Sequence, residues 1–204
     1  MKGLLIVLEG LDGAGKTTVA IEIVDMLSRR GYKALYTYEP FDSPFAQALS
    51  KVKSELSLSP LIDALAMACD RAYHVETIVM PHLEKGYVVV MDRYFYSTIA
   101  YQGAMGIDLE WLRILNSVFI KPDLAIYLDV EPDEGLRRSR ARKWVFYEKP
   151  EILRRAREIY LEMVRRGELI LVDAMKPKEE VVEIVWKYVE KHLSRVNRGL
   201  NNPG

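Results

Sequence analysis

The sequence predicts an α/β fold, a three-layer sandwich in which helices cover both faces of a five-stranded parallel sheet. Five short apolar runs without polar alternation are typical of strands buried on both faces. Segments with apolar residues at helical spacing separate these runs. A glycine-rich turn joins the first run to the first helical segment. The predicted strands cover residues 4–8, 33–38, 87–91, 124–128 and 169–172.

Capping residues set the boundaries of the predicted helices. Gly31 is expected to end the first helix, and Ser59-Pro60 combines an N-cap with proline at the first helical position. Pro81 should kink or interrupt the long helix that follows. The first helix begins near Lys16, a later one begins within 129–132 and carries residues up to 143, and the last begins at 177. The other helices are predicted at 44–53, 60–85, 96–101, 108–118 and 150–166.

Length and composition favour one domain and exclude several classes of protein. The 204 residues suit a single domain over residues 1–196, with residues 197–204 as a flexible tail. Lys plus Arg and Asp plus Glu each total 29, a net charge of zero that argues against a nucleic-acid binder. No apolar run is long enough for a membrane span or a signal peptide. The single cysteine, Cys69, is expected to pack inside an apolar helix, and we expect a cytoplasmic protein.

The first strand leads into a phosphate-binding pattern. Residues 10–17 fit G-x-x-x-x-G-K-[ST], with Gly10, Gly15, Lys16 and Thr17 at the fixed positions. Glycines let successive N–H groups point at phosphate oxygens, and the helix N-terminus adds partial positive charge. Lys16 can reach the outer phosphates, while the Thr17 hydroxyl can ligate Mg2+. A turn that binds nothing is the alternative, but the order strand, turn, helix favours the P-loop nucleoside triphosphate hydrolase fold.

Two further groups of residues indicate chemistry at the same edge of the sheet. Asp92 ends the third strand, where a carboxylate can hold magnesium-bound water or a substrate hydroxyl. The segment from Arg137 to Lys143 carries five cations, which suits a lid that closes over a migrating phosphoryl group, although a solvated helix face is the alternative. A pocket for a base and a phosphate is predicted from the polar residues beside the loop, which are Arg71, Asp92, Arg93, Ser97, Tyr101 and Gln102.

Several motifs in this order resemble the thymidylate kinase family across nearly the whole chain. They are GLDGAGKTT at 10–18, DRY at 92–94, STIAYQG at 97–103 and PDLAIYLDVEPDEGLRRSRAR at 122–142. The resemblance implies a nucleoside monophosphate kinase that uses ATP and Mg2+ to phosphorylate dTMP to dTDP. It also implies a homodimer packed through helices.

The resemblance assigns roles to individual residues. The ATP-binding residues it implies are Gly10, Leu11, Asp12, Gly13, Ala14, Gly15, Lys16, Thr17 and Thr18. Thr17 and, through water, Asp92 would hold the metal. Arg71 would recognise the thymine edge, Arg93 the acceptor phosphate, and Asp12 the sugar hydroxyl or phosphate region of dTMP. Four further residues are implied beside the base or the deoxyribose, namely Met67, Ser97, Tyr101 and Gln102. The catalytic set is Lys16, Asp92, Arg93, Arg140 and Arg142.

The glycine at position 13 bears on the role of the lid, which we expect at about 136–148. Family members with glycine at this position of the loop take their catalytic arginine from the lid, which points to Arg140 or Arg142. The chain departs from the family at two pocket positions. Met67 stands where a phenylalanine usually stacks on thymine, and Tyr38 stands where an arginine usually precedes Glu-Pro. The lid also continues as KWVFYEK after Arg142 instead of an acidic stretch.

The predicted reaction is therefore transfer of the ATP γ-phosphoryl group to dTMP. A kinase of another nucleoside monophosphate or of a deoxynucleoside remains an alternative, because Met67 changes the face of the base site. A P-loop nucleotide switch is less favoured, since the sequence lacks an Asn-Lys-x-Asp motif and an additional lysine early in the loop.

Overall fold

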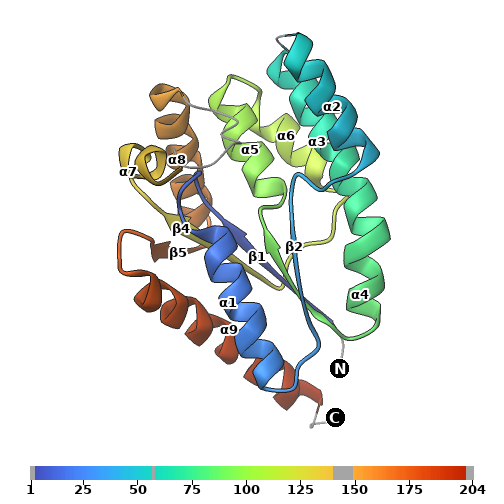
Figure 1. Ribbon diagram of the computed structural model, residues 1–204, viewed down its shortest axis with the longest axis vertical. Helices are drawn as coiled ribbons and strands as arrows, with labels where there is room; N and C mark the ends of the chain where they lie inside the picture. Colours follow the sequence, from blue (N-terminus) through green and yellow to red (C-terminus); the bar gives the residue numbers. More distant parts are fainter. Residues whose placement is uncertain (1–2, 57, 140–148, 201–204) are drawn as a thin grey trace.

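The computed structural model describes residues 3–56, 58–139 and 149–200, and these form the predicted α/β fold around a five-stranded sheet (Figure 1). The strand order is β2-β3-β1-β4-β5, and all neighbouring strands are parallel. The carboxyl ends of the strands therefore lie at one edge, where loops in such folds bind ligands. The strands are β1 (Leu4–Glu9), β2 (Ala34–Tyr38), β3 (Val88–Asp92), β4 (Leu124–Asp129) and β5 (Ile170–Asp173).

Helices connect the strands and cover the sheet. α1 packs with α9 against one face, and α5 packs with α8 in the layer on the other side of the sheet (Figure 1). The helices are α1 (Lys16–Arg29), α2 (Pro44–Glu55), α3 (Pro60–His74), α4 (Met80–Glu84), α5 (Phe95–Ala104), α6 (Leu109–Asn116), α7 (Pro132–Ser139), α8 (Pro150–Arg165) and α9 (Lys178–Leu200). Within the described residues, no helix combines the length and apolar character needed to cross a membrane.

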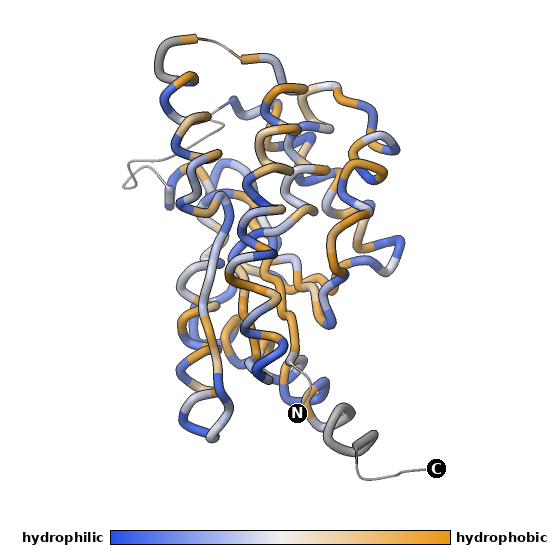
Figure 2. Tube along the Cα trace, turned by 90° about the vertical axis from the view of Figure 1, so that its right-hand side faces the viewer, coloured by the Kyte–Doolittle hydropathy of each residue, from blue (hydrophilic) through white to orange (hydrophobic). Residues whose placement is uncertain are grey.

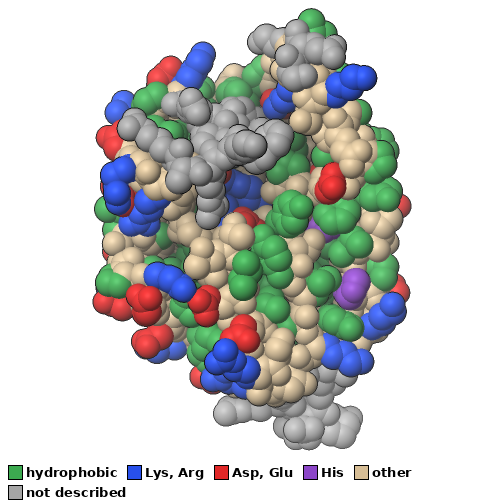
Figure 3. Space-filling model, viewed as in Figure 1, with side chains coloured by type: hydrophobic (Ala, Val, Ile, Leu, Met, Phe, Trp, Pro, Cys, Tyr) green, Lys and Arg blue, Asp and Glu red, His purple; other side chains and the backbone are tan. Residues whose placement is uncertain are grey.

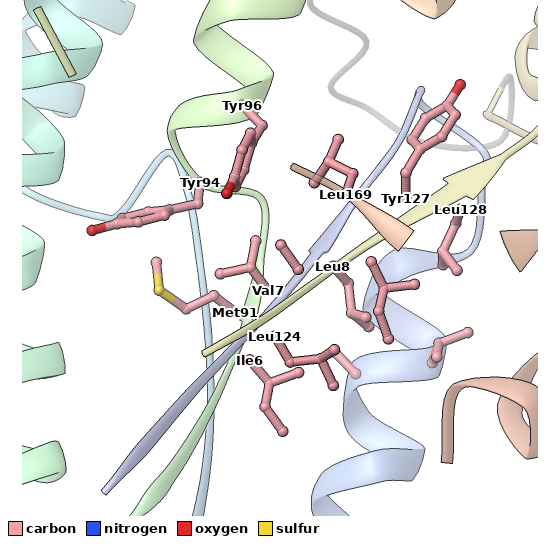
Figure 4. Close-up of a cluster of buried hydrophobic side chains, with 14 of the residues drawn as sticks. Ile6, Val7, Leu8, Met91, Tyr94, Tyr96, Leu124, Tyr127, Leu128 and Leu169 are labelled. Carbon is pink, nitrogen blue, oxygen red and sulfur yellow. The ribbon is translucent and has the colours of Figure 1, made fainter. Parts of the chain in front are cut away.

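The central strands form the core. Every residue of β1 and β3 is buried, and their side chains meet those of β4 in an apolar cluster (Figure 4). The same strands run as hydrophobic segments through the middle of the molecule (Figure 2). The prediction that all five strands are buried on both faces was wrong for the two outer strands. Tyr38 on β2 is 44% exposed, and Leu171 on β5 is 39% exposed. These two strands are the sheet edges, a position that an apolar run alone does not reveal.

The long helix before β3 is interrupted as predicted. Between α3 and α4, a π-helical turn, η1 (Val75–Val79), carries the chain to Pro81. Proline cannot donate the backbone hydrogen bond that an α-helix needs, and its ring crowds the preceding turn. The wider turn accommodates both effects without ending the helix.

Two details differ from the sequence prediction. Cys69 is exposed on α3, so the prediction that it packs inside the protein is wrong. The five residues before it in the sequence are apolar, but its own side of the helix faces solvent in the single chain. Helix α9 continues to Leu200, so residues 197–200, which we had assigned to the tail, are helical. Residues 201–204 lie outside the described part of the chain.

Candidate active site

The phosphate loop lies between β1 and α1, as predicted. Gly13 has a φ of 81°, and a Cβ there would lie 2.1 Å from the carbonyl oxygen of Gly135. In return, a Cβ on Gly135 would lie 2.6 Å from the carbonyl oxygen of Asp12. Backbone therefore packs directly on backbone where the loop meets α7. No side chain fits at residue 13, which gives a physical reason for a catalytic cation to come from another element.

Lys16 begins α1 and points back across the loop. Its Nζ donates a hydrogen bond of 2.8 Å to the carbonyl oxygen of Leu11. Burial lowers the pKa of Lys16 to about 8, and the nearby positive charge of Arg93 adds to this shift. The ammonium group thus lies in a desolvated position where phosphate oxygens would compensate its charge.

Thr17 and Asp92 meet across the gap between the loop and β3. The Thr17 hydroxyl donates to Oδ2 of Asp92. Among the described residues, no cluster of three His, Cys, Asp or Glu side chains could hold a metal ion. A hydroxyl and one carboxylate nevertheless fit Mg2+, which prefers oxygen ligands and commonly takes most of them from water and substrate phosphates.

Arg93 joins the phosphate loop to the neighbouring pocket. Its Nη1 donates to the Gly10 carbonyl and the Ser97 hydroxyl, both at 2.9 Å, and its Nη2 donates to Asp12 at 2.5 Å. The guanidinium carbon lies 5.3 Å from the centroid of the Tyr101 ring. Burial alone would lower the pKa of Arg93, but Tyr101 and Asp12 raise it well above its usual value. Arg93 is therefore a permanent positive charge at the boundary of the two sites.

The backbone of Arg93 is also unusual. Its φ is 72°, in the left-handed region that non-glycine residues seldom occupy. Its N–H donates to the Leu8 carbonyl at 2.9 Å, which keeps the residue close to the end of β1. Such conformations often occur at functional sites, because surrounding contacts must hold them. Here the conformation turns the chain sharply between the end of β3 and the start of α5.

The pocket beside the loop gathers all the residues that the resemblance implied for dTMP, but not Asp92, which we had also predicted in the pocket and which lies against Thr17 instead. The cavity has a volume of about 150 Å³, and a hollow with basic side chains at its base is visible on this face of the molecule (Figure 3). Its predicted lining residues are Asp12, Met67, Arg71, Arg93, Ser97, Tyr101 and Gln102. Glu39, Pro40, Tyr94 and Thr98 complete the wall and were missed. The first two had been interpreted only as the end of a strand, while Thr98 lay unnoticed inside a recognised motif.

Arg71 is anchored by residues that the sequence prediction also missed. It is 2% exposed, and its Nε donates to Glu39 at 2.9 Å. Its Nη1 donates to Asn116 at 2.6 Å, and its Nη2 donates to Thr98 at 3.0 Å. Glu39 lies in the loop between β2 and α2, Asn116 on α6 and Thr98 on α5. No local sequence pattern could therefore have grouped these three acceptors.

Glu9 is connected to Arg93 through the Ser97 hydroxyl, and we had assigned it no role from the sequence. It is fully buried and accepts hydrogen bonds from the Tyr94 backbone N–H at 2.8 Å, the Ser97 hydroxyl at 2.6 Å and the Tyr160 hydroxyl at 2.9 Å. Burial raises the pKa of its carboxyl group, although the Ser97 hydrogen bond opposes that shift. A charged residue directly after five apolar ones was the available signal for this position.

The predicted lid arginines, Arg140 and Arg142, lie outside the described residues. The described arginines before them are already paired. Arg137 and Arg138 both bond to Glu134, and Arg138 also donates to the Ala174 carbonyl at 2.9 Å. Tyr38, at the position where the resemblance leads us to expect an arginine, is 44% exposed and does not line the acceptor pocket.

Comparison with known proteins agrees with this geometry. A family model described as thymidylate kinase matches residues 8–185. A probable thymidylate kinase from Staphylothermus marinus is 44% identical over 193 residues, covering 94% of this chain and 96% of the relative. One from Archaeoglobus fulgidus is also 44% identical over 193 residues, covering 94% and 97%. One from Pyrococcus abyssi is 40% identical over 202 residues, covering 95% and 98%.

Proposed function

We propose that this chain, which belongs to the thymidylate kinase family, transfers the γ-phosphoryl group of ATP to dTMP to form dTDP, a step of dTTP synthesis. The observation that carries the proposal is the position of Arg93. Its guanidinium bonds to the phosphate loop at Gly10 and Asp12 and also lines the acceptor pocket. One positive charge therefore faces both sites between which a phosphoryl group would move.

The transfer needs little covalent chemistry from the protein. The acceptor phosphate is already an anion, so catalysis consists of positioning and charge stabilisation without a general base. Lys16 supplies charge from the donor side and Arg93 from the acceptor side. Mg2+, when held by Thr17 and through water by Asp92, supplies further positive charge to the donor phosphates. Lys16 is buried and the side chain of Arg93 is only 15% exposed, which strengthens these interactions because less water screens them.

The pocket walls suit a pyrimidine nucleotide. Met67 would cover one face of the base, Arg71 and Gln102 would meet its polar edge, and Tyr101 would lie against the deoxyribose. Asp12 would contact the sugar or the phosphate region, with Ser97 close to the base. The backbone N–H groups of residues 10–18 would hold the triphosphate of ATP. Residues 1–196 would form a single kinase domain, in which a lid at about 136–148 brings Arg140 or Arg142 to the transferred group.

We further propose a homodimer in the cytoplasm. Leu61, Leu65, Cys69 and Tyr73 are exposed and repeat every four residues along α3, so they form one stripe. This apolar face, which we call the α3 stripe, is suited to a second copy of the chain. A lone exposed thiol also suits a reducing compartment.

Steady-state kinetics with ATP and Mg2+ tests the proposed reaction. We expect dTMP to be phosphorylated much faster than dUMP, dGMP or thymidine, because the pocket offers cations to the acceptor phosphate and polar groups to the base. Lys16→Ala and Arg93→Ala should each lower kcat about 100-fold or more. The matched control Arg29→Ala removes an arginine that is exposed on α1 and should leave activity unchanged.

Separate Arg140→Ala and Arg142→Ala variants identify the lid residue that contributes to the reaction. Rapid phosphorylation of thymidine without activity on dTMP would contradict the proposal. So would ATP hydrolysis that requires another protein and phosphorylates no acceptor. Normal turnover in Lys16→Ala would remove the phosphate loop from the mechanism.

A further inference from the structure

We propose that Asn116 is a specificity-determining positioning residue, which sets the base selectivity of the acceptor pocket by fixing the orientation of Arg71. The inference rests on the proposed function, since it concerns the base of the nucleotide that the pocket takes. Asn116 ends α6 and is 3% exposed. It contacts Arg71 from outside the pocket, because it does not belong to the pocket lining.

The amide of Asn116 has one possible orientation in this environment. Its Nδ2 donates to the Leu112 carbonyl at 2.8 Å, an atom that can only accept. Its Oδ1 must therefore face Arg71, where it accepts the 2.6 Å hydrogen bond from Nη1. The helix backbone thus fixes the acceptor, and the acceptor fixes one side of the guanidinium plane.

The remaining contacts of Arg71 complete this restraint. Glu39 holds Nε and Thr98 holds Nη2, so three atoms of the fork are bonded. The guanidinium carbon also lies 5.6 Å from the Tyr94 ring centroid and 5.4 Å from that of Phe119. These aromatic side chains oppose rotation of the plane. Because Arg71 lines the pocket, the N–H groups that these three bonds leave unused are the ones available to a bound base.

This orientation has a chemical consequence for the ligand. An arginine N–H can bond to a base carbonyl, but it repels an amino group at the same place. A fixed guanidinium therefore favours a keto pyrimidine over its amino counterpart. A guanidinium released on one side can turn away, which reduces the penalty for the amino base. Asn116 contributes this selectivity without adding charge, because its oxygen is neutral, whereas Glu39 bonds to Arg71 through a carboxylate.

The position also permits a clean substitution. Asn116 borders a second cavity of about 440 Å³ between residues of α5 and α6, and Arg71 does not line it. A leucine is similar in size to asparagine and can use this space, while it lacks the oxygen that Arg71 needs. Asn116→Asp keeps an oxygen at the same atom position, and although it loses the Nδ2 donor to Leu112, its charge-assisted bond to Arg71 replaces that anchor. Ser117→Ala is a matched control at the end of α6, because the Ser117 hydroxyl bonds only to the Ile114 carbonyl among the described residues.

The experiment compares kcat and KM for dTMP and for 5-methyl-dCMP, which differ at the keto and amino position of the base. For Asn116→Leu, the ratio of the two kcat/KM values should fall about tenfold or more, through a higher KM for dTMP. Its kcat for dTMP should stay within about threefold of wild type. Asn116→Asp should retain most of the ratio, and Ser117→Ala should match wild type. Asn116→Ala carries the same expectation as Asn116→Leu and replaces it if the leucine variant does not fold.

An unchanged ratio in both Asn116→Leu and Asn116→Ala would overturn the inference. A loss of kcat with an unchanged ratio would also overturn it, because that result describes a purely structural residue. A wild-type protein that does not phosphorylate dTMP would overturn the proposed function as well, and the wild-type measurement alone reveals that case.

Discussion

At the scale of single residues, the lowered pKa of Lys16 should make the ATP affinity of the phosphate loop depend on pH. Burial and the charge of Arg93 lower its pKa to about 8, while triphosphate oxygens favour the protonated form. Binding of ATP must therefore add a proton to Lys16 once the pH exceeds that value. We expect ATP affinity to be nearly constant below about pH 7.5 and to fall by up to about tenfold per pH unit above pH 8. Titration calorimetry between about pH 7.5 and 9.5 measures this dependence.

The matched control is Lys16→Arg. An arginine stays charged throughout this range, so its ATP affinity should be lower but independent of pH. The same pH dependence in Lys16→Arg would show that a different group titrates and would contradict the assignment to Lys16.

At the scale of secondary-structure elements, the backbone contact between the phosphate loop and α7 leads to a test. Gly135→Ala would favour α7 by about 1 kcal/mol through helix propensity. Its Cβ, however, would lie 2.6 Å from the Asp12 carbonyl oxygen, which is backbone and cannot rotate away. Overpacking of this kind costs about 1–3 kcal/mol, so the contact should open. Because Asp12 bonds to Arg93, we expect kcat/KM for dTMP to fall about tenfold or more.

Thermal unfolding and kinetics of Gly135→Ala, measured together, test this coupling. Asp133→Ala lies in the same helix with an exposed side chain and serves as the control, with activity close to wild type. If Gly135→Ala gains stability and keeps full activity, α7 and the loop are not coupled in this way.

The elements themselves were largely predictable from local signals. The buried strands showed continuous apolar runs, Ser59-Pro60 marked the start of α3, and Pro81 marked its interruption. The candidate site was predictable only where a motif or the family resemblance assigned it. The resemblance assigned Arg71, but Asn116 and Thr98 reach it from elements 45 and 27 residues away. Such contacts depend on how helices pack, which no spacing within one segment encodes.

Exposure was the least predictable property for the same reason. Cys69 lies in an apolar helix, so its composition suggested burial, whereas the face on which it lies is decided by the neighbours of α3. The edge position of β2 and β5 likewise follows from strand order, which a single apolar run does not determine. Glu9 shows the converse, because a single charged residue at the end of an apolar strand is a local signal of a buried polar contact, although we had not used it.

At the scale of the whole molecule, α3 connects the two proposed properties of the protein. Met67 and Arg71 line the acceptor pocket from this helix, while the α3 stripe, Leu61, Leu65, Cys69 and Tyr73, faces away from it. A stable dimer buries about 800 Å² per partner, more than a stripe of four side chains supplies. Exposed apolar residues on the adjacent helix α2, Phe45 and Val52, enlarge the face.

Leu65→Glu tests whether this face joins two copies. A carboxylate in the centre of an apolar interface would have to be desolvated, so we expect the dimer to dissociate to monomers. Sedimentation equilibrium over a range of protein concentrations measures the change. Ile21→Glu places the same charge on α1, where Ile21 is 51% exposed, and should leave the dimer intact. A monomeric wild type, or dissociation in Ile21→Glu and not in Leu65→Glu, would contradict the proposed interface.

Because α3 also carries Met67 and Arg71, loss of the partner should loosen the acceptor wall more than the phosphate loop. The Leu65→Glu variant should therefore show a higher KM for dTMP with a nearly unchanged KM for ATP.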